Sequence, residues 1–264
     1  MTNHARRALD RGRLQASLGG PWSGIQIIDA TGSTNADLIG DAPTRHAGTV
    51  LVAEYQRAGR GRLDRRWASP PRAGLTFSVL LRPSAPTPLW GWLPLLAGVA
   101  VRDAVAELTG LDAMLKWPND LLLGAGRRKA AGILVQVTGD AVVVGVGLNV
   151  STTAAELPVD SATSLAIESG APPPDRTELL VAILAALGRR YADWDAAAGD
   201  AEASGLAAAY RAKCATIGRD VVVSGTDGGS YEGRATGIDA DGRLVLTSDG
   251  RQRLVAAGDV RHLR

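Results

Sequence analysis

The sequence predicts an α+β fold in two parts, and three observations lead to this prediction. Strand-length runs of β-branched and apolar residues alternate with helix-spaced apolar stripes over about the first 216 residues. From residue 217 the helical pattern stops, and short strand candidates are separated by Asp-Gly pairs, which favour tight hairpin turns. A chain of 264 residues is long enough for one large domain and a small one. We therefore expect a larger domain over residues 1–216 and a small antiparallel β module over residues 217–264.

Composition and charge argue against several classes of protein. The net charge is only +2, so broad nucleic-acid binding is not expected. The single cysteine, Cys214, excludes a disulfide framework, and the histidines His4, His46 and His262 are too scattered for a metal site or a nucleophile–base pair. The N-terminus carries no secretory signal, and the longest apolar run, residues 89–101, is shorter than the roughly 20 residues of a membrane span. We expect a cytoplasmic protein without a membrane segment.

The first fifty residues predict a polar helix, a strand and a capped helix. A helix within residues 6–18 ends at Gly19-Gly20-Pro21, and residues 25–29 read as a strand. Ser33 or Thr34 then caps a second helix, with Asp37 in its first turn. A plain helix cap explains this pattern, but a serine and a threonine beside free backbone amides can also bind an anion or a polar ligand head.

An arginine-rich segment, residues 54–70, is the most informative part of the chain. It joins two strand candidates, residues 49–56 and 75–82, and contains five arginines, whose planar charged forks match phosphate or carboxylate oxygens. Gly59 and Gly61 allow left-handed angles and a close approach to a ligand. Gln56 can both donate and accept, and Trp67 can stack on a flat ring. The segment alone is equally consistent with a disordered, solvated basic loop.

Two further strands carry polar residues among apolar ones. After a core helix over residues 89–108, residues 115–117 form a strand, and Pro118-Asn119-Asp120 is a turn signal in which Asp120 is a candidate Mg²⁺ ligand. From residue 130 the next strand is apolar at both parities, which predicts that both of its faces are covered. Lys129 shares its parity with the core positions of that strand, so it either snorkels to solvent or faces a ligand that Gly132 admits.

The remaining segments complete the predicted architecture. Residues 141–150 form a central strand with Gly145, Gly147 and a polar exit at Asn149. Helices are expected at residues 176–194 and 201–213. The β module then has strand candidates at residues 219–224, 231–238, 243–247 and 251–255, with turns at Asp227-Gly228, Asp241-Gly242 and Asp249-Gly250.

Four motifs in order give the chain a resemblance to the biotin protein ligases from about residue 25 to its C-terminus. They are Gly59-Arg60-Gly61-Arg62, Lys116-Trp117-Pro118-Asn119-Asp120, Arg128-Lys129-Ala130-Ala131-Gly132-Ile133 and Val144-Gly145-Val146-Gly147-Leu148-Asn149. The resemblance implies a mixed β-sheet flanked by helices, related to class II aminoacyl-tRNA synthetases and lipoyl ligases, with an SH3-like C-terminal barrel.

The resemblance also implies roles for individual residues. Ser33, Thr34, Gln56, Gly59, Arg60, Lys129 and Gly132 would bind biotin; Arg62, Arg65, Arg66, Trp67, Asn119 and Asn149 would bind ATP. Lys129, Arg60 and Arg62 would be catalytic, and Asp120 would hold Mg²⁺. Asp64 departs from the family pattern, in which a small residue is usual between Arg62 and Arg65.

The implied reaction has two steps. Biotin and ATP form biotinyl-5′-AMP, and the biotinyl group passes to a lysine of a biotin carboxyl carrier protein domain. Some relatives also carry an N-terminal DNA-binding domain, but only about twenty residues precede the first core strand here, so no sequence-specific DNA binding or repressor function is expected.

Two alternatives stay open. A lipoate–protein ligase or octanoyl transferase would share the fold and use another acid. A non-catalytic nucleic-acid-binding module would use the arginines on phosphates and the small barrel as a reader, but the net charge is nearly neutral and Tyr231 is the one aromatic residue available on that barrel.

Overall fold

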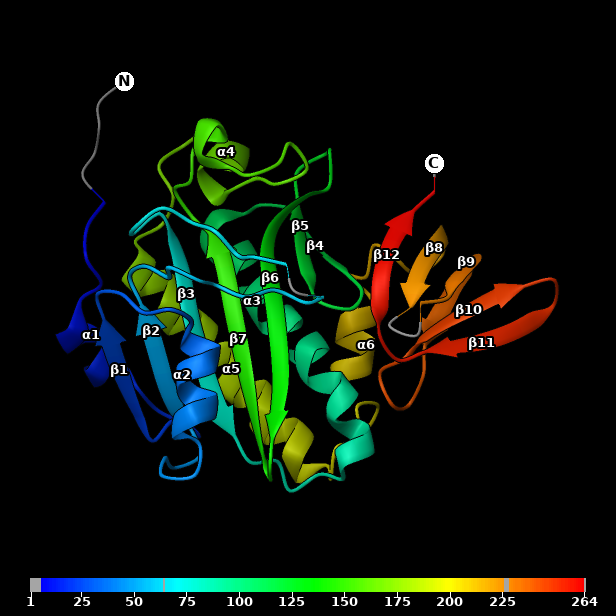
Figure 1. Ribbon diagram of the computed structural model, residues 1–264, viewed down its shortest axis with the longest axis horizontal. Coiled ribbons are helices and arrows are strands. Elements are labelled where there is room, and N and C mark those ends of the chain that lie inside the picture. Colours follow the sequence, from blue (N-terminus) through cyan, green and yellow to red (C-terminus); the bar gives the residue numbers. More distant parts are fainter. Residues whose placement is uncertain (1–5, 64, 226–227, 264) are drawn as a thin grey trace.

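A seven-stranded mixed sheet forms the centre of the protein (Figure 1). The computed structural model describes residues 6–63, 65–225 and 228–263. The strand order is β1-β2-β3-β7-β6-β5-β4; β1 and β2 are parallel, and all other neighbours are antiparallel. The strands are β1 (Gly24–Ile28), β2 (Thr49–Ala53), β3 (Gly74–Leu81), β4 (Ala113–Lys116), β5 (Asp120–Leu123), β6 (Arg128–Thr138) and β7 (Ala141–Asn149).

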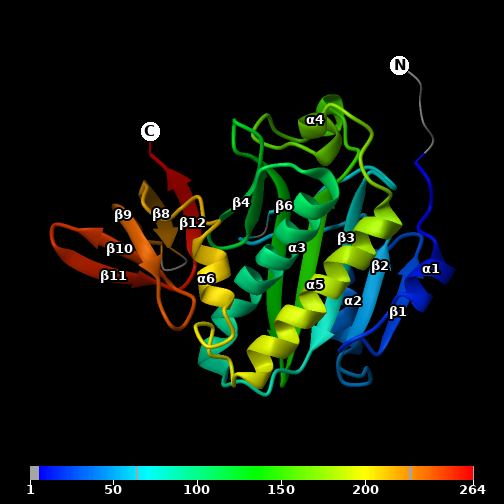
Figure 2. The ribbon, with the colours of Figure 1, turned by 180° about the vertical axis from the view of Figure 1, so that it is seen from behind.

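Helices cover the two faces of this sheet unequally. The long helices α3 (Leu93–Thr109) and α5 (Arg176–Ala196) lie together on one face (Figure 2), and the short α2 (Thr34–Asp41) lies on the other (Figure 1). The arginine-rich segment also crosses the α2 face, in front of β7 and β6 (Figure 1). The remaining helices are α1 (Arg11–Ala16), α4 (Leu165–Ser169) and α6 (Leu206–Arg211), with 3₁₀ turns η1 (Thr87–Trp92) and η2 (Ala154–Glu156).

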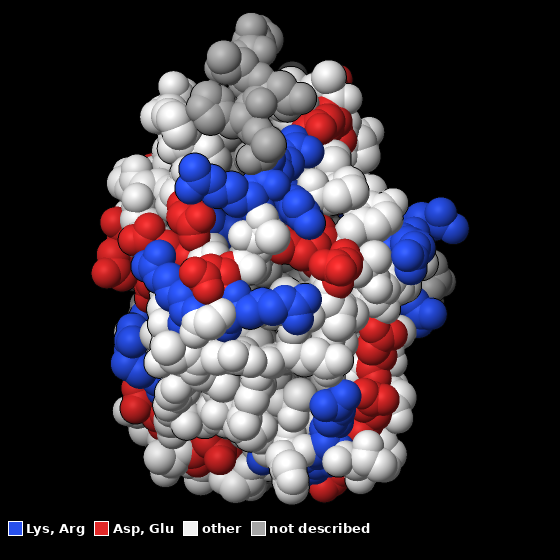
Figure 3. Space-filling model, turned by 90° about the vertical axis from the view of Figure 1, so that its left-hand side faces the viewer, with Lys and Arg blue, Asp and Glu red and all other residues white. Residues whose placement is uncertain are grey.

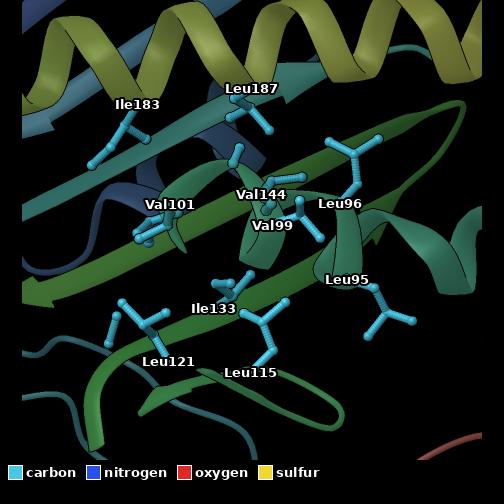
Figure 4. Close-up of a cluster of buried hydrophobic side chains, with 14 of the residues drawn as sticks. Leu95, Leu96, Val99, Val101, Leu115, Leu121, Ile133, Val144, Ile183 and Leu187 are labelled. Carbon is cyan, nitrogen blue, oxygen red and sulfur yellow. The ribbon is translucent and has the colours of Figure 1, made fainter. Parts of the chain in front are cut away.

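The hydrophobic core explains the unequal cover. On β3 and β7 alternate residues point to opposite faces, and the apolar set that includes Val144 packs beneath α3 and α5 (Figure 4). On the α2 face a much smaller cluster forms around Leu38, Leu80 and Val143. The rest of that face is left open for polar residues, and the cavity described below lies there.

The C-terminal residues form a separate five-stranded antiparallel sheet, consistent with the predicted SH3-like unit. Its order is β11-β10-β9-β8-β12, with β8 (Asp220–Gly225), β9 (Ser230–Ile238), β10 (Leu244–Ser248), β11 (Arg251–Val255) and β12 (Gly258–His262). Asp249 and Gly250 both have positive φ, 51° and 72°, as the tight hairpin between β10 and β11 requires. Trp92 and Trp117 each donate an indole N–H to backbone carbonyls of the 240–242 turn, which ties this sheet to the larger one.

Several boundaries differ from the sequence prediction. The first helix is shorter than residues 6–18, because Asp10 caps it and accepts from the Arg13 amide. Helix α6 is likewise shorter than residues 201–213, and the five-residue elements α4 and β12 were not predicted. His4, Asp64 and Asp227 lie outside the described residues.

The apolar helical segment Thr87–Thr109 is longer than the run at residues 89–101 suggested. Its 23 residues are sufficient in length and composition to cross a membrane, although 61% of its most apolar window is buried inside the protein, as in a core helix. Strand β6 also differs: only its first half is covered on both faces, and Val137 is 58% exposed.

Candidate active site

One cavity on the α2 face collects most of the predicted site residues. The loop before α2, the arginine-rich segment, β5, β6, β7 and the start of β12 all contribute to its wall. Twelve of the predicted residues line it: Ser33, Thr34, Gln56, Arg60, Arg62, Arg65, Arg66, Trp67, Asn119, Asp120, Lys129 and Gly132. Gly59 and Asn149 are not among the residues that line it. Residues about one hundred positions apart therefore meet at one site.

One end of the cavity, the uncharged end, is formed by Ser33, Thr34, Asn35 and Gln56 together with Ser78 behind them. Ser33 caps α2 by accepting from the Ala36 amide at 3.4 Å, so the predicted cap is confirmed. The Thr34 amide donates to Gln56 Oε1 at 2.8 Å, which fixes the glutamine against the helix N-terminus. Ser33 and Thr34 are only 4% and 3% exposed. Polar groups buried so deeply keep a defined orientation because each must find a partner.

Sequence reasoning missed Asn35 and Ser78. Ser78 contacts Thr34 Oγ1 and Asn35 Oδ1, and Asn35 donates to Gln136 Oε1 on β6 at 2.9 Å. A Cβ on Gly145 would lie 1.9 Å from Asn35 Oδ1, so this strand glycine makes room for the asparagine. The sequence feature that could have revealed Ser78 is a serine within the mostly apolar strand β3, which the sheet pairs with Gly145 of β7.

The arginine-rich segment folds back on itself, with backbone hydrogen bonds between the residues on either side of Asp64. Its base is held by Glu54, which forms a buried 2.7 Å ion pair with Arg176 of α5. The Trp67 amide donates to the Gly59 carbonyl at 2.9 Å, and the Gly61 amide donates to the Arg65 carbonyl at 2.7 Å. The turn therefore brings Arg60, Arg62, Arg65 and Arg66 to the cavity.

The glycines of this hairpin do not have the left-handed angles that the sequence suggested. The left-handed residue is Leu63, with φ 52°, and neither Gly59 nor Gly61 has positive φ. Gly59 is needed for close packing instead, since its Cβ would lie 2.4 Å from the Trp67 carbonyl oxygen and 2.9 Å from Gln56 Nε2.

The other end of the cavity, the cationic end, is formed by Arg60, Arg62, Arg65 and Lys129. Burial lowers the pKa of Arg62, and the nearby Asp120 and Asp259 oppose that shift. Arg65 pairs with Asp259 of β12 at 2.6 Å, which raises the pKa of Arg65. The C-terminal sheet thus supplies a carboxylate to the cavity, a contribution that the sequence did not reveal.

Lys129 faces the cavity because of a β-bulge. The pairing of β5 with β6 shifts so that Leu121 opposes Ala131 and Leu122 opposes Lys129, which leaves Ala130 as the extra residue. The side chain therefore lies on the Gly132 face, where Nζ would be 3.3 Å from a Cβ on that glycine. Simple alternation had assigned it to the core face. Its Nζ pairs with Asp120 Oδ1 at 2.5 Å, so it does not snorkel to bulk solvent.

Trp67 lies flat over two strand glycines. A Cβ on Gly147 would be 2.4 Å from its ring, and a Cβ on Gly132 would be 3.4 Å away. Its Nε1 is buried and has no hydrogen-bond partner among the described residues. A buried, unpaired indole N–H in a cavity wall indicates a place where a ligand acceptor can bind.

Asn119 and Asn149 are held differently from each other. Asn119 Nδ2 donates to the Ile133 carbonyl at 2.8 Å, at the cavity wall. Asn149 is 4% exposed, and its Nδ2 donates to the Thr163 carbonyl at 3.0 Å. Its Oδ1 has no partner in the described part of the chain, which leaves an acceptor at the end of β7.

Asp120 is the one predicted metal ligand. Over the described residues there is no group of three His, Cys, Asp or Glu side chains that could hold a metal ion. Two carboxylates, Asp120 and Asp259, beside several cations fit an ion that arrives with a phosphate ligand, because Mg²⁺ takes few carboxylates and completes its shell with phosphate oxygens and water.

The comparisons with known proteins agree with this site. The pattern of the biotin/lipoate A/B protein ligase family matches residues 28–151, and that of the biotin protein ligase C-terminal domain matches residues 216–263. The biotin–[acetyl-CoA-carboxylase] ligase of Mycobacterium tuberculosis is 44% identical over 252 residues, which are 93% of this chain and 91% of that protein.

The chain belongs to the biotin protein ligase family. As a member of this family it is an enzyme, a ligase. A second relative, the biotin–[acetyl-CoA-carboxylase] ligase of Paracoccus denitrificans, is 30% identical and is matched over 89% of this chain and 98% of its own length. The bifunctional ligase/repressor BirA of Bacillus spizizenii is 34% identical over 88% of this chain and 71% of its own length.

Solved structures confirm the fold. The biotin protein ligase of Aquifex aeolicus in complex with biotin and ATP superposes with a TM-score of 0.78 at 28% identity, over 92% of this chain and 100% of that one. The resemblance to biotin protein ligases stated from the four motifs is thereby confirmed for the fold class and the family.

Proposed function

We propose that the protein activates biotin with ATP to form biotinyl-5′-AMP and transfers the biotinyl group to a lysine of a biotin carboxyl carrier protein domain. The observation that supports this proposal is that one cavity has both an uncharged end and a cationic end. Its uncharged end offers Thr34 and Gln56 as hydrogen-bonding groups, and its cationic end offers Arg60, Arg62 and Lys129. A ligand with a neutral polar head and a distant carboxylate fits this order of groups.

In the first step the cationic end acts on negative charge. The carboxylate oxygen of biotin attacks the α-phosphorus of ATP, the bond to the β-phosphate oxygen breaks, and pyrophosphate leaves with that electron pair. Carboxylate and triphosphate repel each other, so positive side chains must offset the charge as it builds up. Lys129 pairs with Asp120, and Arg62 also interacts with the charge of Asp120, so both cations act where phosphate charge would otherwise meet an acidic group. Holding both reactants in one cavity supplies much of the remaining acceleration.

The predicted Mg²⁺ fits the site only together with ATP. Asp120 would hold it, and the ion would neutralise phosphate charge. Trp67 and the Oδ1 of Asn149 are the groups that we assign to the adenine, because each presents a buried polar atom without a partner in the described structure. Arg65, Arg66 and Asn119 complete the proposed ATP site.

In the second step the carrier lysine amine attacks the acyl carbon, AMP leaves, and the amine loses a proton. No protein nucleophile takes part. Cys214 is buried and lies outside the cavity wall. The arginine hairpin would keep water from the mixed anhydride until the carrier arrives.

The rival functions are weaker on specific grounds. A lipoyl head has no N–H group for the uncharged end to bind. For a nucleic-acid-binding module, the face shown in Figure 3 carries basic and acidic side chains next to one another above a large uncharged area. A uniform positive field is what broad phosphate binding requires.

We also propose that residues 1–216 are the catalytic domain and residues 217–264 the small C-terminal domain. A cytoplasmic location, where ATP is available, and the absence of membrane association and of sequence-specific DNA binding stay predictions. Binding assays with labelled double-stranded DNA fragments test the last of these.

Biotin-dependent exchange of labelled pyrophosphate into ATP tests the proposed function, with lipoate as the control acid. Exchange with biotin alone is expected. Exchange with lipoate alone would show that lipoate, not biotin, is the substrate. If folded protein gave exchange with neither acid, the proposed adenylation step would be wrong. Labelled biotin and a purified carrier domain then test the transfer.

A further inference from the structure

A buried ion pair lies at the root of the connection from β2 to β3, residues 54–73, which contains the arginine-rich segment. Glu54 is the first residue after β2, and Arg176 is the first residue of α5. Glu54 Oε2 and Arg176 Nη1 are 2.7 Å apart, and the two residues are only 7% and 8% exposed. A buried charge is costly unless it is paired and hydrogen-bonded. The further partners of this pair therefore show which parts of the chain it holds together.

Arg176 contacts both ends of the connection. Its Nη1 pairs with Glu54 at the start and also donates to the carbonyl of Gly74, the first residue of β3, at 3.1 Å. The Arg72 amide donates to the Glu54 carbonyl at 2.9 Å, which joins the same two ends through the backbone. Arg72 has a left-handed φ of 60°, a conformation that a residue other than glycine keeps only where its surroundings enforce it. One guanidinium thus holds the two ends of a long connection in place.

Residues 6–10, which we call the strap, complete this network. The Leu9 amide donates to Glu54 Oε1 at 2.7 Å, and Arg176 Nη2 donates to the Arg7 carbonyl at 2.6 Å. Both carboxylate oxygens and both terminal guanidinium nitrogens of the pair therefore have partners. The strap, the two ends of the connection and the start of α5 are far apart in the chain, and they meet at this one ion pair.

The root of the connection adjoins the wall of the active-site cavity. Gln56 and Trp67 line that cavity, and the same two residues join Glu54 and Gly74 around a second, smaller cavity. Three of the four residues of the cationic end also belong to this connection, so their positions depend on its root. A misplacement of about 1 Å in groups that act on reacting atoms can lower a rate by about 100-fold.

We propose that Glu54 and Arg176 are positioning residues for adenylation. Their ion pair fixes the root of the connection, and with it the place of the arginines in the cavity, and the strap completes the pair. Neither side chain lines the active-site cavity, so neither acts on the substrates directly. The inference rests on the proposed function for the identity of the reaction. The alternative is an ion pair that only stabilises the fold, and it predicts that activity per folded molecule does not depend on the pair.

A double-mutant cycle separates positioning from stabilisation. Arg176→Met and Glu54→Gln each leave one buried charge unpaired, so each is expected to lower the melting temperature by roughly 10 °C. The double variant buries no charge at this place, and its melting temperature is expected to return most of the way to that of wild type. Biotin-dependent pyrophosphate exchange at saturating substrates, per folded molecule, should stay about 100-fold below wild type in Arg176→Met and in the double variant. Methionine has no N–H group with which to hold the two ends of the connection together.

Two further comparisons use the same assay. Arg190→Met is the matched control, because Arg190 lies on the same helix and pairs with Asp103 of α3 instead. It should lower the melting temperature and keep the exchange rate per folded molecule within about twofold of wild type. Leu9→Pro removes the amide that donates to Glu54, whereas Leu9→Ala keeps it. Exchange by the proline variant should be about tenfold slower than exchange by the alanine variant, the effect of one hydrogen bond to a charged group.

The outcomes separate this proposal from the proposed function. A double variant that regains both its melting temperature and its exchange rate, or an unchanged exchange rate in Arg176→Met, overturns the positioning role while adenylation of biotin stands. A folded wild-type chain without biotin-dependent exchange overturns the proposed function itself. If Arg176→Met does not fold, the double variant and the two Leu9 variants decide in the same way.

Discussion

The uncharged and cationic ends of the cavity use polar residues in opposite ways. At the uncharged end Thr34, Asn35 and Ser78 are almost fully buried and hydrogen-bonded to one another, so their orientation is settled before a ligand arrives. At the cationic end Arg65 and Asp259 form an ion pair with side chains that are 56% and 49% exposed. Exposed pairs contribute little to stability and exchange partners readily.

This difference explains how one cavity can both discriminate between ligands and promote a reaction. A preorganised hydrogen-bond pattern distinguishes ligand heads, because a mismatched head leaves buried groups unpaired. Cations paired with nearby carboxylates, such as Lys129 with Asp120, can instead donate hydrogen bonds to phosphate oxygens. We expect substitutions at the first end to change affinity and discrimination, and substitutions at the second end to change the rate of adenylation.

The largest effect is expected for Lys129→Ala. Removing the one lysine of the cavity wall should slow biotin-dependent pyrophosphate exchange by roughly 100- to 1000-fold, the usual loss for a missing charge-stabilising group. Biotin affinity should fall much less, because the uncharged end is intact. Lys213→Ala, outside the cavity, serves as the control, and near-normal exchange by Lys129→Ala would remove this residue from its role.

The substitution Gly145→Ala, on β7, should disrupt the uncharged end of the cavity. The added Cβ would lie 1.9 Å from Asn35 Oδ1 and must displace it. We expect biotin affinity to fall at least about tenfold and the free energy of unfolding to fall by about 1–3 kcal/mol. Gly237→Ala is the matched strand control, since a Cβ there meets no atom within 4 Å. Unchanged biotin affinity in Gly145→Ala would contradict the assignment of this end to ligand binding.

Arg62→Ala should leave a folded enzyme that holds its adenylate poorly. Arg62 is partly buried between Asp120 and Asp259, so its loss opens the cationic end. We expect roughly tenfold more biotinyl-5′-AMP in solution after gel filtration, with one charged hydrogen bond lost. Arg57→Ala, in the same segment but outside the cavity wall, is the control. If biotin affinity and adenylate retention both match wild type, the hairpin does not cover the intermediate.

The smallest effect concerns Asp259→Asn. Burial alone would raise the pKa of Asp259, but the hydrogen bond from Arg65 and the charges of Lys116 and Lys129 outweigh it, so the pKa is lowered from 3.8. A carboxyl group whose pKa is lowered in the folded state stabilises the folded protein above pH 3.8, its ordinary pKa. That stabilisation is lost as the pH falls through the lower, folded-state pKa.

We therefore expect Asp259→Asn to lower the free energy of unfolding by less than about 1 kcal/mol at pH 7. The difference from wild type should shrink as the pH falls from 3.8 through the lowered pKa, as calorimetric melting at pH 7 and at a series of acidic pH values would show. A difference that persists at the acidic pH points to packing and not to the ion pair. Asp220→Asn, also in an exposed pair but remote from the hairpin, gives the background.

Much of the uncharged end could be predicted from the local sequence, but Ser78 and Asn35, which support it, could not. Ser33 caps α2 because a serine before a helix satisfies free amides, a rule that depends only on neighbouring residues. Ser78 and Asn35 are 43 positions apart, and only the packing of α2 on β3 brings them together.

The cationic end shows the same limit more sharply. The arginines and Lys129 were identified from their motifs, but alternation assigned Lys129 to the wrong face, because a bulge at Ala130 shifts the count by one. Gly59 was assigned a left-handed role, whereas a contact with Trp67 eight positions later is what excludes a side chain there.

The sequence by itself determined the order of the elements, the two-part organisation, the motifs that carry the chemistry and most of the residues of the cavity wall. These properties follow from periodicity, turn chemistry and charge, which act over a few neighbouring residues. Only the tertiary structure decided that Asp259 reaches Arg65, that Trp67 covers Gly147, and that Ser78 forms a hydrogen bond with Thr34. Each of these depends on the pairing of strands distant in the chain, and local preference carries no information about that pairing.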